Sequence, residues 1–148
     1  MRREIKAWLF ILLTVTCVTA CSNPTGQPPK PSEQEIAAIS PGVPFTLKAG
    51  QQAALNVDQV VVSFVNIPED SRCPSDVTCV WAGQVTAVLR VVVGGQALGD
   101  KSLTQMAGQP VSVAFNGYSL TLSAVNPYPI STTPIKPMDY EATLILSQ

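Results

Sequence analysis

Short runs in which apolar and polar residues alternate fill the chain from Phe45 to Gln148. One of them reads VVVSFVN and places Val60, Val62 and Phe64 on one face. Alternation with a period of two is typical of β-strands that bury one face. No stretch between Phe45 and Gln148 has the three-to-four spacing of a substantial amphipathic helix. The pattern therefore predicts an all-β domain.

Two turn signals indicate how neighbouring strands are joined. Asn116 and Gly117 lie between VSVAF and YSLTLSAV. A type I′ turn needs positive φ at both central residues, which Asn-Gly tolerates best, so this segment predicts a β-hairpin. Gly94 and Gly95 predict a second turn.

The last such run is DYEATLILS, residues 139–147, whose alternate residues face one way: Tyr140, Ala142, Leu144 and Leu146. With the earlier runs, this segment brings the expected number of strands to about eight. Strands at such short spacing are typical of sandwiches and small barrels. We therefore expect a small antiparallel β-sandwich or barrel over residues 45–148.

Residues 1–20 have the pattern of an export signal. Arg2, Arg3 and Lys6 precede an uncharged run over residues 7–20. That run is too short to settle as a membrane-spanning helix, which needs about 20 apolar residues. We therefore expect a signal peptide that is removed on export.

The end of this segment, VTAC at residues 18–21, resembles the lipobox of bacterial lipoproteins. The resemblance implies cleavage before Cys21, a diacylglyceryl group on its thiol and acylation of the new amino terminus. Two or more acyl chains anchor a protein stably, whereas one is marginal. We expect anchoring to the outer membrane of a Gram-negative cell, or otherwise to the outer face of the cell membrane. The alternative is an ordinary secretory signal that leaves Cys21 as a free thiol.

Residues 21–44 contain the lipidated cysteine and a segment rich in Pro, Ser, Gln and Glu. Such a composition cannot bury enough apolar surface to offset ordering entropy, so we expect a disordered tether.

Removing residues 1–20 takes away three of the nine basic and one of the ten acidic residues, which leaves a net charge of −3. Because no basic patch is present, the expected partner is a membrane reached through lipid, and not a nucleic acid.

The segment EDSRCPSDVTCVWAG, residues 69–83, holds the two cysteines of the expected domain. Disulfides form and persist outside the cytoplasm, so we expect a bond between Cys73 and Cys79. Closing so small a loop constrains the unfolded chain by roughly 2–2.5 kcal/mol in the chain-entropy model. In a regular strand, Trp81 has the parity of Val85, which places it with the disulfide on the apolar face.

The same segment does not favour a metal site or a redox pair. The chain has no histidine and the domain has no third cysteine, so the ligands of a structural zinc site are missing. A redox pair is normally C-x-x-C at the start of a helix, whereas five residues separate Cys73 and Cys79. We expect neither a metal nor another cofactor.

Four charged residues, Glu69, Asp70, Arg72 and Asp76, lie in this segment. Arg72 either bonds Asp70 or Asp76 and fixes the loop, or these groups form an acid pair or an arginine clamp for a ligand. We favour the first interpretation and keep Asp70, Arg72, Asp76 and Trp81 as candidate binding residues. The missing histidine excludes a Ser-His-Asp triad, and a hydrolase with two carboxylates needs a cleft between them.

The stretch DSRCPSDVTCVWAG resembles a motif of small secreted or lipid-anchored bacterial β-domains. A Pro-Tyr-Pro segment and a terminal Asp-Tyr-x-Ala-x-Leu segment recur in those domains. Here they correspond to NPYP at residues 126–129 and DYEATL at residues 139–144. The resemblance covers about residues 45–148 and supports the extent of the domain and its disulfide. It implies no particular activity.

Three functions are compatible with these observations. The first is a lipid-anchored, non-catalytic β-sandwich that acts as a binding or structural module, with an envelope or extracellular protein as its partner. The second is a protease inhibitor or receptor-type module that inserts the disulfide loop, residues 72–79, into its partner. The third is a hydrolase that uses Asp70 or Glu69. We rank them in this order, and we expect a monomer without catalytic residues.

Overall fold

A computed structural model describes residues 36–148 of the 148-residue chain. The expected signal peptide, Cys21 and the first part of the expected linker lie outside the described residues. The described part has one hydrophobic core. No helix within it has the length and apolar character that a membrane-spanning helix requires.

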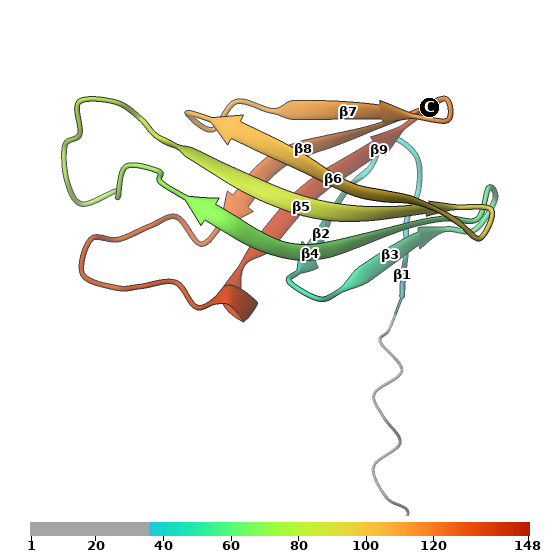
Figure 1. The fold of residues 1–148 in the computed structure, drawn as a ribbon, viewed down its shortest axis with the longest axis horizontal. Coiled ribbons are helices and arrows are strands. Elements are labelled where there is room, and N and C mark those ends of the chain that lie inside the picture. The colour runs from blue at the N-terminus through green and yellow to red at the C-terminus, as the bar shows by residue number, and fades with distance from the viewer. Residues whose placement is uncertain (1–35) are drawn as a thin grey trace, which may run out of the picture. The chain divides into compact units, whose positions relative to one another are not determined.

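The strands of residues 36–148 form two sheets that pack face to face (Figure 1). One sheet has the order β1-β3-β4-β5-β6 and the other the order β2-β9-β8-β7. Neighbouring strands are antiparallel except β1 and β3, which are parallel. A 3-10 helix, η1, covers Pro137–Asp139. The strand bounds are Ala37–Ala38 (β1), Pro44–Lys48 (β2), Gln52–Leu55 (β3), Val60–Asp70 (β4), Gln84–Val93 (β5), Gln96–Met106 (β6), Val111–Phe115 (β7), Tyr118–Asn126 (β8) and Glu141–Ser147 (β9).

Alternate side chains of both sheets meet in one core, as the sequence pattern predicts. Val60, Val62 and Phe64 of β4 are fully buried, and so are Leu144 and Leu146 of β9. Successive residues of a strand point to opposite faces, so a strand with one buried face needs apolar residues only at every second position. The all-β class is confirmed, and of the two expected architectures the chain adopts the sandwich.

The hairpin predicted at Asn-Gly joins β7 to β8. Phe115 pairs with Tyr118, and Asn116 and Gly117 between them have φ angles of 42° and 82°. Positive φ at both central residues is the geometry of a type I′ turn. The turn expected at the two adjacent glycines joins β5 to β6.

The domain begins earlier than the sequence indicates. β1 runs along the edge of β3, where Ile39 N donates a hydrogen bond of 3.0 Å to Ala54 O. Ile39 packs against the core, and β2 begins at Pro44. Two strands therefore begin before the boundary expected at residue 45. The polar composition of residues 21–44 as a whole concealed this short apolar segment.

Candidate functional site

Two long connections lie side by side at one end of the sandwich, on the left in Figure 1. Residues 71–83 join β4 to β5, and residues 127–140 join β8 to β9. They contact each other where Ser75 N donates a hydrogen bond of 3.0 Å to Pro129 O. We call these two segments the paired loops.

Cys73 and Cys79 form a disulfide within the first of the paired loops, as predicted. Their Cα atoms lie 5.9 Å apart. Cys73 is half-buried and its N–H donates a hydrogen bond of 2.9 Å to Ala82 O, whereas Cys79 is exposed. A small loop that is closed at its base has few conformations available. The bond therefore restricts the shape of residues 74–78.

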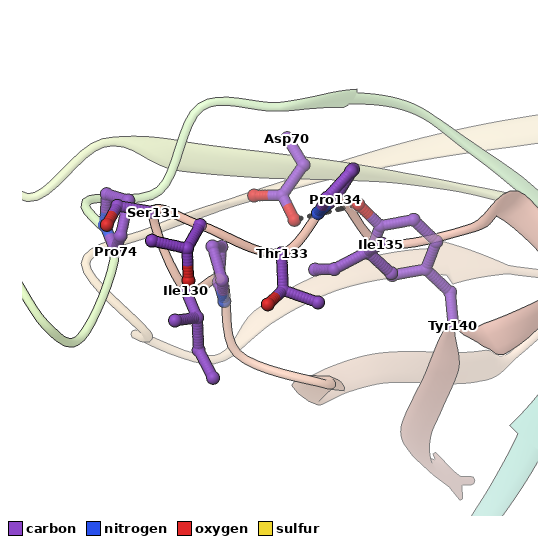
Figure 2. A pocket seen from close by; sticks show the side chains of 10 residues that line it. Asp70, Pro74, Ile130, Ser131, Thr133, Pro134, Ile135 and Tyr140 are labelled. Carbon is purple, nitrogen blue, oxygen red and sulfur yellow. Dashed lines mark hydrogen bonds between the residues drawn. The ribbon is translucent and has the colours of Figure 1, made fainter.

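The paired loops line a cavity of about 330 Å³. Its wall consists mainly of residues 129–135 of the second loop, with Pro74 from the first. Asp70 and Tyr140 also line the cavity, and Figure 2 shows their side chains on its wall. The Tyr140 hydroxyl donates a hydrogen bond of 3.0 Å to Asp70 Oδ2, so these two groups already bind each other.

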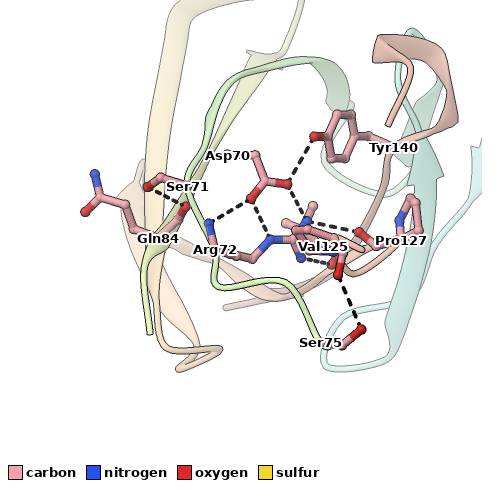
Figure 3. A network of polar contacts seen from close by, with 9 residues as sticks. Asp70, Ser71, Arg72, Ser75, Gln84, Val125, Pro127 and Tyr140 are labelled. Atoms are coloured by element: carbon pink, nitrogen blue, oxygen red, sulfur yellow. Dashed lines mark hydrogen bonds and ion pairs between the residues drawn. The ribbon is translucent and has the colours of Figure 1, made fainter. Parts of the chain in front are cut away.

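Arg72 is buried beside Asp70, and its side chain is the centre of the network in Figure 3. Its Nε and Nη2 atoms donate to Asp70 Oδ1 and Oδ2 over 2.8 and 2.6 Å. Such a bidentate, charge-assisted pair is strong and has one preferred geometry. Only 6% of Arg72 is exposed. Of the two partners expected for Arg72, Asp70 and Asp76, the structure shows the bond to Asp70.

Arg72 also joins the first loop to the other sheet. Its Nη1 donates to Val125 O over 2.6 Å, and its Nη2 donates to Pro127 O over 3.0 Å. Its Cζ atom lies 5.0 Å from the centre of the Tyr128 ring, a cation–π contact. A guanidinium tolerates burial when acceptors satisfy its fixed set of donors. One side chain thus connects the end of β4 in one sheet with the end of β8 in the other.

Asp70 accepts four hydrogen bonds: two from the Arg72 side chain, one of 3.2 Å from Arg72 N and one from Tyr140. Burial alone raises the pKa of Asp70, but the hydrogen bonds and charge of Arg72 outweigh burial, so the pKa lies below its ordinary value of 3.8. Burial, together with the charge of Asp70, raises the pKa of Tyr140 to about 12. At neutral pH Asp70 is therefore ionised and Tyr140 is protonated.

The three segments that carry the sequence resemblance meet in this network. The first supplies Asp70 and Arg72, NPYP supplies Pro127 and Tyr128, and the last supplies Tyr140. Their contact has a physical basis, because a buried arginine needs an acid partner and carbonyl acceptors. Here the three segments act together as a brace at the end of the sandwich.

Gly83 ends the first loop in a left-handed conformation with φ of 76°. A Cβ atom at this position would lie 2.0 Å from Ser71 O and 2.7 Å from Arg72 Cα. The backbone at the start of the loop therefore passes directly over Gly83, and a side chain cannot fit there. β5 begins only at the next residue, Gln84.

Trp81 does not lie in the core, so the expectation from strand parity is wrong. Trp81 is 55% exposed, and Val80 before it is 104% exposed. Alternation holds within β5, where every second residue from Val85 to Val91 is buried. The left-handed turn at Gly83 interrupts it, so the parity of β5 cannot be extended back to Trp81.

Six large apolar side chains are exposed at this end of the sandwich. Five belong to residues 71–83 and 127–130 of the paired loops, and the sixth lies at the end of β6, opposite Gln84. Met138 of η1 is also exposed, but it lies beside Gly50 and is not part of this surface. The sequence indicates only Trp81 among the six as a candidate binding residue, because aliphatic residues next to a strand resemble core residues. We call this surface the apolar end, and its residues are Val77, Val80, Trp81, Met106, Tyr128 and Ile130.

The four candidate binding residues fall into two groups. Asp70 and Arg72 belong to the buried network, whereas Asp76 and Trp81 lie on the exposed loop. The Asp76 carboxylate accepts hydrogen bonds from Ser131 N and Oγ over 2.8 and 2.5 Å, which joins the paired loops a second time.

Within residues 36–148, no group of three His, Cys, Asp or Glu residues is placed to hold a metal ion. No protein-family model, curated protein or solved structure matches the chain.

Proposed function

We propose that the protein is a lipid-anchored component of the cell envelope whose β-sandwich is a non-catalytic binding module. In this proposal Cys21 carries the anchor and the apolar end makes the contact. The resemblance of VTAC to a lipobox supports the anchor. One observation carries the binding role: the consecutive residues Val80 and Trp81 are exposed on a loop that is fixed at its base.

The exposure of Val80 and Trp81 is energetically unfavourable in water. Full burial of one large apolar side chain stabilises a protein by about 1.5–3 kcal/mol. Scattered single exposures are normal, but a group of exposed apolar residues on adjoining loops marks a contact surface. The apolar end is such a group, because five of its six residues lie on two loops that are bonded to each other.

The contact surface is ordered before any partner binds. The disulfide closes residues 73–79, Ser131 holds Asp76, and the Arg72 network fixes the base of the loop. A surface that is already ordered loses little conformational entropy on binding. Rigid aromatic side chains such as Trp81 are typical of residues that dominate a binding energy.

The geometry of the acidic residues does not favour a hydrolase. A general acid or base needs a carboxyl group that can exchange its proton near neutral pH. Asp70 is held ionised by four donors, and its pKa lies below the ordinary value. Glu69 is exposed and accepts a hydrogen bond of 3.3 Å from Gln84 Nε2.

A second candidate is an inhibitor or receptor-type module that inserts residues 72–79 into a partner protein. The exposure of residues 75–79, together with the disulfide that closes them, favours this candidate. Arg72 is the only basic residue of the segment, and its burial leaves it unable to recognise an acidic pocket of a partner. Recognition would therefore depend on apolar side chains such as Val77.

Photocrosslinking in intact cells tests the binding role. A benzophenone amino acid replaces Val80 in one variant and Val57 in a matched control. Val57 is 86% exposed, but it lies in the turn before β4, at the opposite end of that strand from the paired loops. We expect an adduct with an envelope component from position 80 and none from position 57. Equal adducts at both positions, or none, would contradict the proposal, and a protease adduct would select the second candidate.

A further inference from the structure

The residues at the tip of the first loop protrude and do not line a pocket. The exposed fractions of Val77, Val80 and Trp81 are 47%, 104% and 55%. None of the three lines the cavity between the paired loops. Small-molecule ligands are usually enclosed in concave sites. A protruding apolar tip is instead suited to entering the surface of a lipid membrane or the groove of another molecule.

The side chains of the apolar end match the composition of a bilayer interface. Val77, Val80 and Ile130 are purely aliphatic, whereas Trp81 and Tyr128 combine an apolar ring with one polar group. Tryptophan and tyrosine are enriched where the hydrocarbon region of a membrane meets its headgroups. The Tyr128 ring is held in place by its contact with the Arg72 guanidinium, 5.0 Å away.

Few charges oppose the transfer of this surface into lipid. The paired loops contain four charged side chains, Arg72, Asp76, Lys136 and Asp139, of which the last two lie at η1, beyond the segments that carry the apolar end. Arg72 is buried and paired, and the Asp76 carboxylate accepts two hydrogen bonds from Ser131. Lack of exposed basic residues on these segments means that attraction to anionic lipids contributes little, so contact depends on apolar area.

The length of the chain outside the described residues allows the apolar end to reach the membrane of the anchor. Fourteen residues, 22–35, separate Cys21 from Ile36. Such a segment spans at most about 50 Å when fully extended. A tethered domain has a high effective concentration at its own membrane, so even weak intrinsic affinity gives a populated contact.

From these observations we infer that the apolar end docks on the lipid surface of the membrane that holds the Cys21 anchor. The inference rests on the proposed function, since it names the partner of the same surface. Trp81, Val77 and Val80 enter the headgroup region, and Tyr128 and Ile130 follow at the edge of the contact. Docking orients the sandwich so that its opposite end faces away from the membrane.

The fluorescence of Trp81 tests this inference directly. The other tryptophan, Trp8, belongs to the expected signal peptide, so Trp81 is the only tryptophan of the mature protein. The lipidated mature protein is purified from cells and reconstituted into phosphatidylcholine vesicles, with or without lipids brominated in the acyl chains. We expect the emission of Trp81 to lie at shorter wavelength with vesicles than without them. We also expect the brominated lipids to quench this emission.

Two charge variants separate docking from anchoring. Val80→Asp places a charge at the tip and is expected to abolish the quenching, while the protein still floats with the vesicles. Val57→Asp adds the same charge at the other end of β4 and is expected to leave the quenching unchanged. Both sites are exposed, so neither substitution is expected to unfold the domain, and thermal unfolding curves of the two variants check this.

The outcomes for wild-type protein distinguish the two proposals. Unquenched Trp81 in protein that floats with the vesicles overturns lipid docking and leaves the anchored binding module standing, with a protein as the partner. Purified mature protein that does not float with the vesicles contradicts the Cys21 anchor, and with it the proposed function. Quenching in wild type that Val80→Asp does not reduce also overturns docking through the apolar end.

Discussion

At the scale of single residues, Gly83 is the position of the candidate site where a side chain is least tolerated. Its φ of 76° favours glycine, and a Cβ atom would lie 2.0 Å from Ser71 O. Gly83→Ala forces two backbone segments apart next to the Arg72 network. We expect the free energy of unfolding to fall by more than about 3 kcal/mol, as for other severe backbone conflicts. Urea unfolding followed by circular dichroism measures the loss.

Gly95→Ala is the matched control for this prediction. Gly95 has a similar φ of 80°, but a Cβ atom there would meet no heavy atom within 4 Å. The control therefore carries only the cost of the left-handed conformation, about 1–2 kcal/mol. Equal losses for the two variants would show that the crowding at Gly83 has no energetic consequence.

Asp70 links the stability of the fold to pH. Its folded pKa is lowered from 3.8, because the hydrogen bonds and charge of Arg72 outweigh burial. A carboxyl group with a lowered folded pKa stabilises the protein above its unfolded pKa, and this contribution is lost as the pH falls through the folded pKa. We expect wild-type stability to fall steeply below about pH 4. Asp70→Asn should be less stable at pH 7 and show a flatter acid limb.

Urea midpoints measured between pH 7 and acid pH test the role of Asp70. Asp100→Asn is the control, because Asp100 pairs with Arg90 on the exposed outer face of the sandwich. The control is expected to leave the stability at pH 7 nearly unchanged, since exposed ion pairs contribute little. Parallel acid limbs for wild type and Asp70→Asn would refute the linkage.

At the scale of elements, the first loop is expected to serve contact more than stability. Trp81 is half-exposed outside β5, so Trp81→Ala should change the free energy of unfolding by less than about 0.5 kcal/mol, as is usual for surface substitutions. Phe64→Ala, in the buried face of β4, should cost about 3–5 kcal/mol. Denaturant melts of both variants compare the two positions. A large loss of stability in Trp81→Ala would show that this side chain supports the fold.

The success of sequence reasoning differs from strand to strand for a physical reason. β4 and β9 bury one face, so Phe64 and Leu144 reveal the period of two. β6 gives a weak signal because its first half, residues 96–101, has no fully buried residue and contains Gly99 in a left-handed conformation. The pattern did not predict the position of Trp81, because alternation holds only within a continuous strand and β5 begins at Gln84.

The candidate site was predictable only in its local part. Asp70 and Arg72 are two residues apart, so their pairing follows from short-range geometry. The bonds from Arg72 to Val125 and Pro127, and from Tyr140 to Asp70, join positions 53, 55 and 70 residues apart. Those contacts depend on the order of strands in two sheets, which the pattern of one strand does not contain.

At the scale of the whole molecule, the described structure separates the supporting framework from the exposed apolar end. The two sheets and the Arg72 brace hold the paired loops, and the apolar end lies on those loops. A small apolar surface alone gives weak and reversible association with lipid. Stable attachment in our proposal therefore depends on Cys21, and the apolar end sets the orientation.

Substitution of Cys21 tests the lipid anchor. Cys21→Ala removes the thiol that a lipobox would modify, while Cys17→Ala changes a cysteine of the expected signal peptide and serves as the control. The uncharged run of residues 7–20 can hold an uncleaved precursor in the membrane. The Cys21→Ala chain is therefore expressed with an ordinary cleavable secretory signal in place of residues 1–20. We expect it in the soluble fraction, because the apolar end alone binds lipid too weakly to survive dilution. The Cys17→Ala protein should stay in the membrane fraction, with acyl chains on its N-terminal peptide by mass spectrometry. Recovery of cleaved Cys21→Ala protein with the membranes would mean that the folded domain, and not a lipid, provides the attachment.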